Sequence, residues 1–197
     1  APHVELGDPR GRQHLGGAEP FRGGVAVDRD VAEIGEQLGR PARGIVAIAS
    51  RCPSGHPNVV KTEPRLPDGT PFPTLYYLTD PRLTAEASRQ ESAGVMRGMT
   101  ERLQQDEDLA RAYLAAHESY LAERDAIESL GTDFTGGGMP ERVKCIHVVM
   151  AHALAKGPGV NPFGDESVVL AARADGGKLC GTAIPADWPG IDEGDEQ

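Results

Sequence analysis

The segment GGGMPERVKCIHVVMAHALAKGPGVNPFGD, residues 136–165, decides the fold, and the rest of the chain is organised around it. Its three leading glycines are followed by Pro140, a residue that suits the first position of a helix. Apolar residues then recur at spacings of three and four, and Gly157 with Pro158 forms a stop signal. The pattern predicts a helix from Pro140 to Lys156 with one buried face.

Cysteine and histidine are the usual protein ligands of zinc, and two stretches of the chain contain both types. Cys145 and His147 lie on the predicted helix, and Cys52 and His56 lie in the loop RCPSGHP. Side chains two positions apart on a helix point about 200° apart, so at most one of the helical residues joins a single-ion site easily. The alternative is that Cys145 is a small buried hydrophobic residue. A cysteine in a Pro/Gly loop after a buried strand is placed to react, so Cys52 and His56 are the candidate catalytic pair.

The glycines before the predicted helix suggest a second kind of site. Free N–H groups at a helix N-terminus bind anions, and Gly137 and Gly138 would bring the main chain close to such a ligand. Arg142 and Lys144 follow in the first turns and would add positive charge. We expect these four residues to bind a small anion, with a simple flexible hinge as the alternative interpretation.

Composition excludes several classes of function. The net charge of −10 argues against general nucleic-acid binding, which depends on neutralising phosphates. There is no apolar run near 18 residues and no apolar leader, so we expect neither a membrane span nor a secretory signal. Three cysteines do not suggest a disulfide framework, and a reducing cytoplasm is the simplest setting. Composition leaves the oligomeric state open.

The first half of the chain has the pattern of strands and the second half that of helices. Short apolar or β-branched runs between turn residues predict three strands, at residues 44–50, 58–62 and 74–79. Helices are predicted at residues 28–38, 84–96 and 99–130, besides the helix described above. The fold class is therefore α+β, with a small antiparallel sheet of about three strands packed against three to four helices.

The chain ends have a different composition. Residues 1–27 are rich in Gly, Pro and Arg without apolar periodicity, and we expect a disordered tail there. Residues 28–170 are expected to form a single α+β domain. Residues 171–197 are predicted to be an acidic, mostly irregular tail.

Three runs of sequence carry a resemblance to a known family. They are RCPSGHPNVVKTEPRLPDGTPFPTLYYLTDP, HESYLAERDAIE and GGMPERVKCIHVVMAHALAKGPGVNPFGDE. Together they resemble the bacterial domain-of-unknown-function family number 501, common in actinobacteria, over roughly residues 30–166. The resemblance implies that some relatives have cysteine at the positions of Ser54 and Asp80, which would complete a four-thiolate zinc or iron–sulfur site. This chain retains Cys52 and Cys145 of that set.

These observations support two classes of function. In the first, a pocket binds a small anionic ligand or a metal, with or without catalysis. Its metal ligands would come from Cys52, Asp80, Cys145 and His147. In the second, the protein is a non-catalytic adaptor that binds a protein partner through its long helix. The family's neighbourhood, near a septum-formation initiator, links that alternative to cell division.

Overall fold

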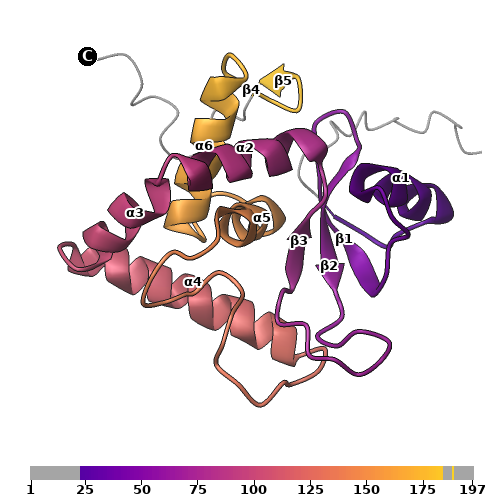
Figure 1. The fold of residues 1–197 in the computed structure, drawn as a ribbon, viewed down its shortest axis with the longest axis horizontal. Helices are drawn as coiled ribbons and strands as arrows, with labels where there is room; N and C mark the ends of the chain where they lie inside the picture. The colour runs from indigo at the N-terminus through magenta and orange to yellow at the C-terminus, as the bar shows by residue number, and fades with distance from the viewer. Residues whose placement is uncertain (1–22, 184–187, 189–197) are drawn as a thin grey trace, which may run out of the picture.

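The computed structural model describes residues 23–183 and Trp188, and it has an α+β fold (Figure 1). The helices are α1 (Asp28–Leu38), α2 (Pro81–Ser92), α3 (Val95–Leu103), α4 (Glu107–Asp125), α5 (Ile146–Lys156) and α6 (Pro162–Ala174). The strands are β1 (Ile45–Arg51), β2 (Pro57–Thr62), β3 (Tyr76–Leu78), β4 (Lys178–Leu179) and β5 (Thr182–Ala183). The predicted fold class is confirmed.

The main sheet has three antiparallel strands in the order β1-β2-β3, as predicted. At the β1 edge, Gly24 exchanges two main-chain hydrogen bonds with Ile48, both 2.8 Å long. Just before β3, the Leu75 N–H donates to the hydroxyl of Tyr120 from α4, at 2.6 Å, while the Leu75 carbonyl accepts the Thr62 N–H of β2.

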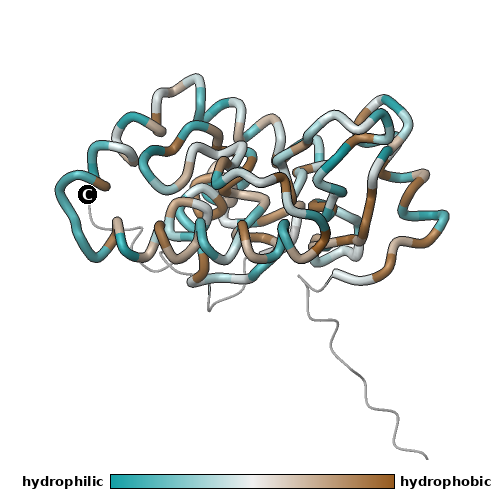
Figure 2. Tube along the Cα trace, turned by 90° about the horizontal axis from the view of Figure 1, so that it is seen from below, coloured by the Kyte–Doolittle hydropathy of each residue, from teal (hydrophilic) through white to brown (hydrophobic). Residues whose placement is uncertain are grey.

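Helix α5 lies in the middle of the larger layer (Figure 1). It packs on β3 on one side and on α2 and α6 on others, while α1 covers the opposite face of the sheet. Its sequence is apolar on all sides rather than on one face, which is typical of a helix surrounded by other elements. Eight of its residues, from Ile146 to Leu154 except His147, are buried. In Figure 2 hydrophobic and hydrophilic positions are interspersed along the surrounding elements, as expected of amphipathic segments.

The predicted start of this helix is wrong. Helix α5 begins at Ile146 and not at Pro140, because the preceding main-chain N–H groups have other partners. The Lys144 N–H donates to the Gly137 carbonyl at 2.8 Å, and the Val143 N–H donates to the hydroxyl of Thr100 at 3.1 Å. The predicted end is confirmed, since Gly157 follows the last helical residue with a φ of 85°.

The predicted long helix of residues 99–130 is also wrong, because it is divided between α3 and α4. Asp106 ends the continuity: its carboxylate accepts the N–H groups of Asp108 and Leu109, both at 3.0 Å, and so starts a new helix. The predicted helix of residues 84–96 begins earlier than expected, because Asp80 and not Thr84 caps α2.

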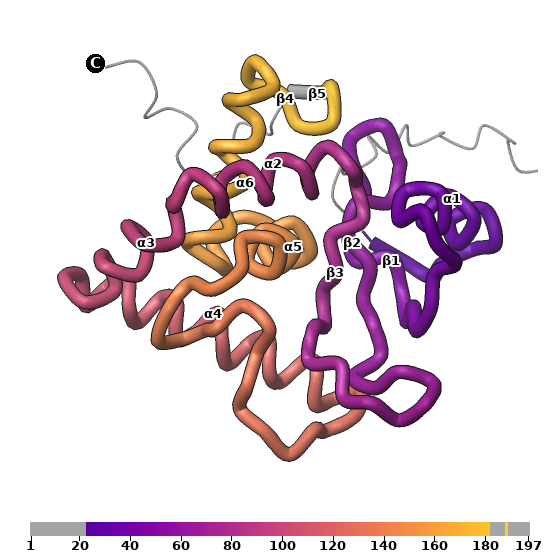
Figure 3. Tube along the Cα trace, viewed as in Figure 1, coloured from indigo at the N-terminus to yellow at the C-terminus, as the bar shows by residue number. Residues whose placement is uncertain are grey.

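Arg124, near the end of α4, fixes the segment that leads back to the core. Its guanidinium is fully buried and donates to the carbonyls of Thr132 and Phe134, both at 2.6 Å. Nearer to the end of α4, Glu128 pairs with Arg65 at 2.6 Å and joins this segment to the β2–β3 loop, which lies beside it (Figure 3). The segment that carries Gly137 and Cys145 is therefore held at several points.

The predicted tails need correction where the structure describes them. Gly24 is paired with the sheet, so the N-terminal tail does not extend to residue 27. Helix α6 crosses the expected boundary at residue 170, and the β4–β5 hairpin and the buried Trp188 follow it. The other predictions for residues 1–22, 184–187 and 189–197 lie outside the described residues. No helix in the described part of the chain is both long enough and apolar enough to cross a bilayer.

Candidate functional site

Three different metal-ligating side chains meet where the end of α2 lies against the start of α5. They are Glu91 from the last turn of α2, Cys145 just before α5, and His147 in its first turn. One ligand atom of each lies within 4.8 Å of the other two. Among the described residues this is the one such group of three or more His, Cys, Asp or Glu side chains. We call it the Glu91 group.

The late start of α5 brings this group together. Cys145 has extended backbone angles, φ −147° and ψ 114°, so it is not one helical position among others. The expectation that Cys145 and His147 diverge by about 200° therefore fails, because it assumed that both lie within one helix. Glu91 closes the arrangement from the other side: its Oε1 accepts the N–H of Ile146 at 2.8 Å.

Both ring nitrogens of His147 have neighbours on α2. Nδ1 lies 3.0 Å from Oε1 of Glu91, and Nε2 lies 3.3 Å from the hydroxyl of Ser88. The His147 and Glu91 side chains are 28% and 27% exposed, so the group is accessible to solutes yet partly shielded from water. These two contacts fix the orientation of the imidazole ring, as outer-shell partners do around metal-ligating histidines.

The electrostatics of Cys145 favour the protonated thiol in the metal-free protein. Burial raises the pKa of Cys145, and the negative charge of Glu91 raises it further. The main-chain N–H groups of Val148 and His147 act in the opposite direction. A cation bound here would stabilise the Cys145 thiolate, because it would compensate the negative charges of both the thiolate and Glu91.

A second group of sulfur and oxygen atoms lies at the other end of α2. The Asp80 carboxylate caps this helix by accepting the N–H groups of Arg82 and Leu83, at 2.8 and 3.1 Å. Its second oxygen accepts the thiol of Cys180 at 3.4 Å. Burial raises the pKa of Cys180 far above its ordinary value, and the nearby Asp80 and Cys52 add to that shift.

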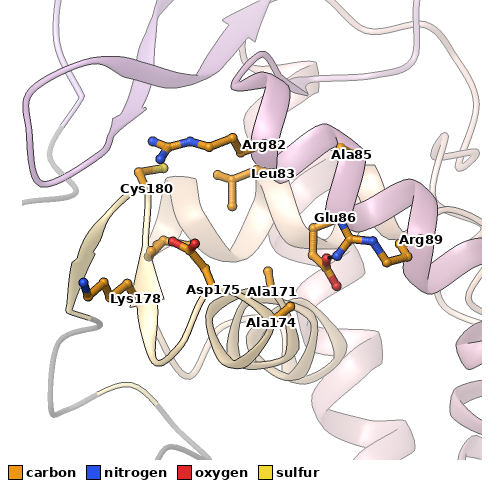
Figure 4. Close-up of a pocket in the computed structure, with 11 residues that line it drawn as sticks. Arg82, Leu83, Ala85, Glu86, Arg89, Ala171, Ala174, Asp175, Lys178 and Cys180 are labelled. Atoms are coloured by element: carbon orange, nitrogen blue, oxygen red, sulfur yellow. Dashed lines mark ion pairs between the residues drawn. The ribbon is translucent and has the colours of Figure 1, made fainter.

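Cys180 also lines a cavity of about 240 Å³ between α2, the end of α6 and β4 (Figure 4). Arg82 reaches toward the Cys180 sulfur from α2, while Lys178 and Asp175 lie on the opposite side. Glu86 and Arg89 form an ion pair within the lining. Opposite charges are mixed along this wall, so it does not favour a ligand of one sign.

The predicted catalytic residues Cys52 and His56 are joined through their main chains, with the Cys52 N–H donating to the His56 carbonyl at 2.8 Å, and not through their side chains. Cys52 is 2% exposed and belongs to the large hydrophobic cluster, so its thiol is shielded from solvent. The His56 side chain is 51% exposed and its Nδ1 lies 2.5 Å from Oε1 of Glu33 on α1. Among the described residues, no hydrogen bond joins the Cys52 thiol to His56.

The predicted metal ligands are divided between the two ends of α2. Cys145 and His147 join Glu91, whereas Asp80 lies eleven residues before Glu91, about 16 Å along the axis at 1.5 Å per residue. Cys52 contributes to the electrostatics of Cys180, which is held by Asp80. The four residues therefore do not converge on one ion.

The predicted anion site does not lie at a helix N-terminus, because α5 begins only at Ile146. The Gly138 N–H donates to the Thr135 carbonyl, and the Arg142 and Lys144 N–H groups donate to the carbonyls of Gly138 and Gly137. The donors that an anion would need are used within this turn. The side chains of Arg142 and Lys144 are exposed, and Lys144 Nζ lies 5.9 Å from the centre of the Phe134 ring.

Sequence reasoning missed Ser88, Glu91 and Cys180. Ser88 and Glu91 are three apart on one helix and therefore share a face, which is the signal that could have linked them. Nothing in the local sequence of α2 indicates that this face meets His147. Cys180 was assigned to an irregular tail, and its approach to Asp80 depends on the hairpin after α6.

The model of the family described as protein of unknown function (DUF501) matches residues 48–169. The chain belongs to the DUF501 family. The matched region runs from β1 into α6 and contains the whole Glu91 group, while Cys180 lies beyond it. No curated protein and no solved structure matches the chain. Membership in DUF501 is consistent with the resemblance in the sequence and assigns no activity.

Proposed function

We propose that the protein binds one zinc ion through the carboxylate of Glu91, the thiolate of Cys145 and the imidazole of His147. The observation that carries the proposal is the approach of their ligand atoms to within 4.8 Å of one another. Carboxylate oxygen, thiolate sulfur and imidazole nitrogen are all zinc ligands. Three protein ligands leave a fourth tetrahedral position for water or a substrate, as in catalytic zinc sites.

The pKa of Cys145 supports a cation at this place. Because burial and Glu91 raise that pKa, the metal-free thiol holds its proton, and binding of Zn²⁺ would release it. Zinc binding should therefore strengthen as the pH rises through the neutral range. The Glu91 carboxylate would exchange its contact with His147 for a metal–oxygen bond, and Ser88 would remain as the partner of the ring.

An open position on the metal would give the site a Lewis acid facing solvent. Such a centre binds small anions and polarises carbonyl or phosphoryl oxygens. Arg142 and Lys144, with exposed side chains, lie on the segment that leads directly into Cys145. We therefore propose that the predicted anion site includes the metal. The metal would hold a small anionic ligand, and Arg142 or Lys144 would be the second contact of that ligand. Phosphate should then raise the melting temperature of the zinc-loaded protein and not that of the metal-free protein.

The test is metal analysis of the full chain by native mass spectrometry, followed by Co²⁺ uptake. One metal per chain and a sulfur-to-cobalt charge-transfer band are expected. The variants Glu91→Gln, Cys145→Ser and His147→Gln should each lose the band or the metal. The variants Cys180→Ser and His56→Gln are matched controls at the other thiol and at an exposed histidine, and both should retain the metal. Absence of uptake by the wild type, or retention by Cys145→Ser, would refute the proposal.

The second candidate is a non-catalytic interaction protein. The observation that favours it is a set of exposed large apolar side chains on α4 and in the segment after it. They are Leu114, Ile127 and Phe134, which are 43%, 37% and 53% exposed. Folded protein that takes up neither zinc nor cobalt would favour this candidate over the first. Replacing Leu114 by Asp would then be expected to abolish partner binding without loss of the fold.

A further inference from the structure

A cavity of about 220 Å³ lies on the sheet face opposite α5, between α1, the first two strands and the β2–β3 loop. It borders the smaller of two hydrophobic clusters, in which only Ile34, Ile48 and Val60 are fully buried. The Glu91 group lies in the other layer, where α2 meets α5. A ligand in this cavity would therefore be independent of the proposed zinc site.

The walls of the cavity are apolar. Ile34 and Leu38 from α1 face Val60 of β2 across it, and the rings of Phe72 and Tyr77 form one side. These two rings are tilted at 35° with their centres 6.3 Å apart. A concave apolar surface with polar groups only at its rim is the usual form of a small-molecule site.

The rim is positively charged. Arg40 and Arg43 come from the loop after α1, while Arg65 and Glu63 come from the chain after β2. Arg65 is already paired with Glu128 at 2.6 Å. In the described part of the chain, no acidic side chain lies within ion-pair distance of Arg40 or Arg43. The rim thus offers one carboxylate, Glu63, and two arginines that form no ion pair with any described residue.

We propose that this cavity binds a small amphipathic carboxylate, whose apolar part fills the cavity while Arg40 and Arg43 hold its head group. Arginine favours carboxylates because its planar fork can donate two parallel hydrogen bonds. An apolar cavity of about 150 Å³ holds benzene. By the same proportion, the larger space here suits a chain of about eight carbons or a bicyclic ring.

In the test, the full-length protein is titrated by isothermal titration calorimetry with three probes whose apolar chains have seven or eight carbons. Octanoate carries a negative head group, octanol a neutral one and octyltrimethylammonium a positive one. Octanoate should bind saturably at one site, with a Kd on the order of 1 mM or tighter. Octanol should bind more weakly, and octyltrimethylammonium weakest. Equal affinities for the three probes, or no saturable octanoate binding, would overturn the proposal.

Substitutions then place the ligand. The double variant Arg40→Gln with Arg43→Gln should weaken octanoate binding about tenfold and leave octanol unchanged. Arg97→Gln, an exposed arginine on α3, is the matched control and should change neither affinity. Ala42→Phe lies in the lining and should abolish binding of both probes, with circular dichroism to verify the fold. If Ala42→Phe does not fold, Leu66→Trp at the loop side of the cavity replaces it.

Two outcomes identify a different occupant. Binding of octanoate that persists in the folded cavity-filling variant would place the ligand elsewhere and refute the inference. If the protein does not bind free octanoate but sediments with phosphatidylglycerol vesicles, its ligand is a lipid surface and not a free carboxylate. Neither result would affect the cobalt-uptake experiment, because the two sites share no residue.

Discussion

The two faces of the β1-β2-β3 sheet differ in how completely their side chains are buried. On the α5 face, residues from every helix except α1 join one large cluster, closed by Tyr113, Phe163 and Trp188. On the α1 face, three fully buried residues are bordered by partly exposed ones and by a cavity. Burial of apolar area is the main source of stability, so the α5 face should account for most of it.

The difference suggests a division of roles between the layers. A densely packed layer tolerates little change in volume, whereas a thin layer with unfilled space can accept a ligand at small cost. Besides its small hydrophobic cluster, the α1 layer is held by polar links, among them the ion pair of Arg51 with Asp30 at 2.8 Å. Four substitutions test this comparison.

The largest effect is expected in the α5 layer. Leu154 is fully buried near the end of the central helix, so Leu154→Ala should lower the free energy of unfolding by about 2–5 kcal/mol. Urea denaturation measures this loss. Val46→Ala, at a side chain 43% exposed on β1, is the control and should stay within about 0.5 kcal/mol of the wild type. A loss below 1 kcal/mol for Leu154→Ala would mean that the α5 layer is not the stabilising one.

A gain in stability is expected at Asp165, which is buried in the same layer. Burial raises its pKa to about 6, and the hydrogen bond from the Gly159 N–H at 2.9 Å offsets only part of that rise; the other oxygen has no hydrogen-bond partner among the described residues. A folded-state pKa above the unfolded one means that ionised Asp165 destabilises the fold above pH 6, and this penalty disappears as the pH falls toward 4. Asp165→Asn should therefore be more stable at pH 7 by about 1–3 kcal/mol and equal to the wild type near pH 3.5.

The pH dependence supplies an internal check on Asp165. His152 is buried, accepts a hydrogen bond from Asn161 at Nδ1, and has a pKa lowered to about 4. Its neutral form stabilises the fold above pH 6.5, and this contribution is lost as the pH falls toward 4. The two groups oppose each other in the wild type. Asp165→Asn should thus lose stability more steeply than the wild type between pH 6.5 and 4, and parallel curves would contradict the assignment.

An intermediate effect is expected where α1 is attached. The two Asp30 oxygens accept the Arg51 guanidinium at 2.9 and 2.8 Å, and this contact holds the pKa of Asp30 below its usual value. Asp30→Asn should destabilise the protein by about 1–3 kcal/mol, because a charged hydrogen-bonded partner of a half-buried arginine is lost. Hydrogen exchange should show faster opening of α1 and unchanged protection of α5. Equal acceleration in both helices would argue against separate layers.

The smallest effect is expected beside the cavity. Ile34→Val removes one methylene from a fully buried side chain that already borders open space, and should cost about 0.5–1.5 kcal/mol. Thermal denaturation with and without octanoate measures both stability and binding. Octanoate should narrow the difference between variant and wild type if it fills the added space. A cost as large as that of Leu154→Ala would remove the distinction between the two layers.

The sequence predicted local elements better than their ends. The three strands were recognisable because each is a short apolar run bounded by Gly or Pro. The break between α3 and α4 was missed because the apolar spacing continues through Asp106, whose capping role depends on its side-chain contacts. Helix α6 is not among the predicted helices, although Asn161 and Pro162 form a helix-start signal.

The candidate site was only partly predictable, for a similar reason. Cys145 and His147 were proposed as ligands from residue type, but Glu91 is 54 positions before Cys145 and no local pattern links them. Their approach depends on α2 packing against α5 and on the turn that delays the start of α5. Cys52 was predicted to be reactive because it lies in a Pro/Gly loop, whereas its side chain packs into the large hydrophobic cluster.

The hydrogen bond from Leu75 to the Tyr120 hydroxyl has a consequence beyond this single chain. An edge strand with unpaired main-chain groups can recruit a strand from another molecule, which leads to fibrillar association. Here Gly24 satisfies both main-chain groups of Ile48 on the β1 edge, and the Tyr120 hydroxyl accepts the buried Leu75 N–H where the chain enters β3. Tyr120→Phe would keep the ring in the core and leave that N–H without its acceptor, so the start of β3 should open more readily and the variant should be more prone to aggregate at high concentration than the wild type.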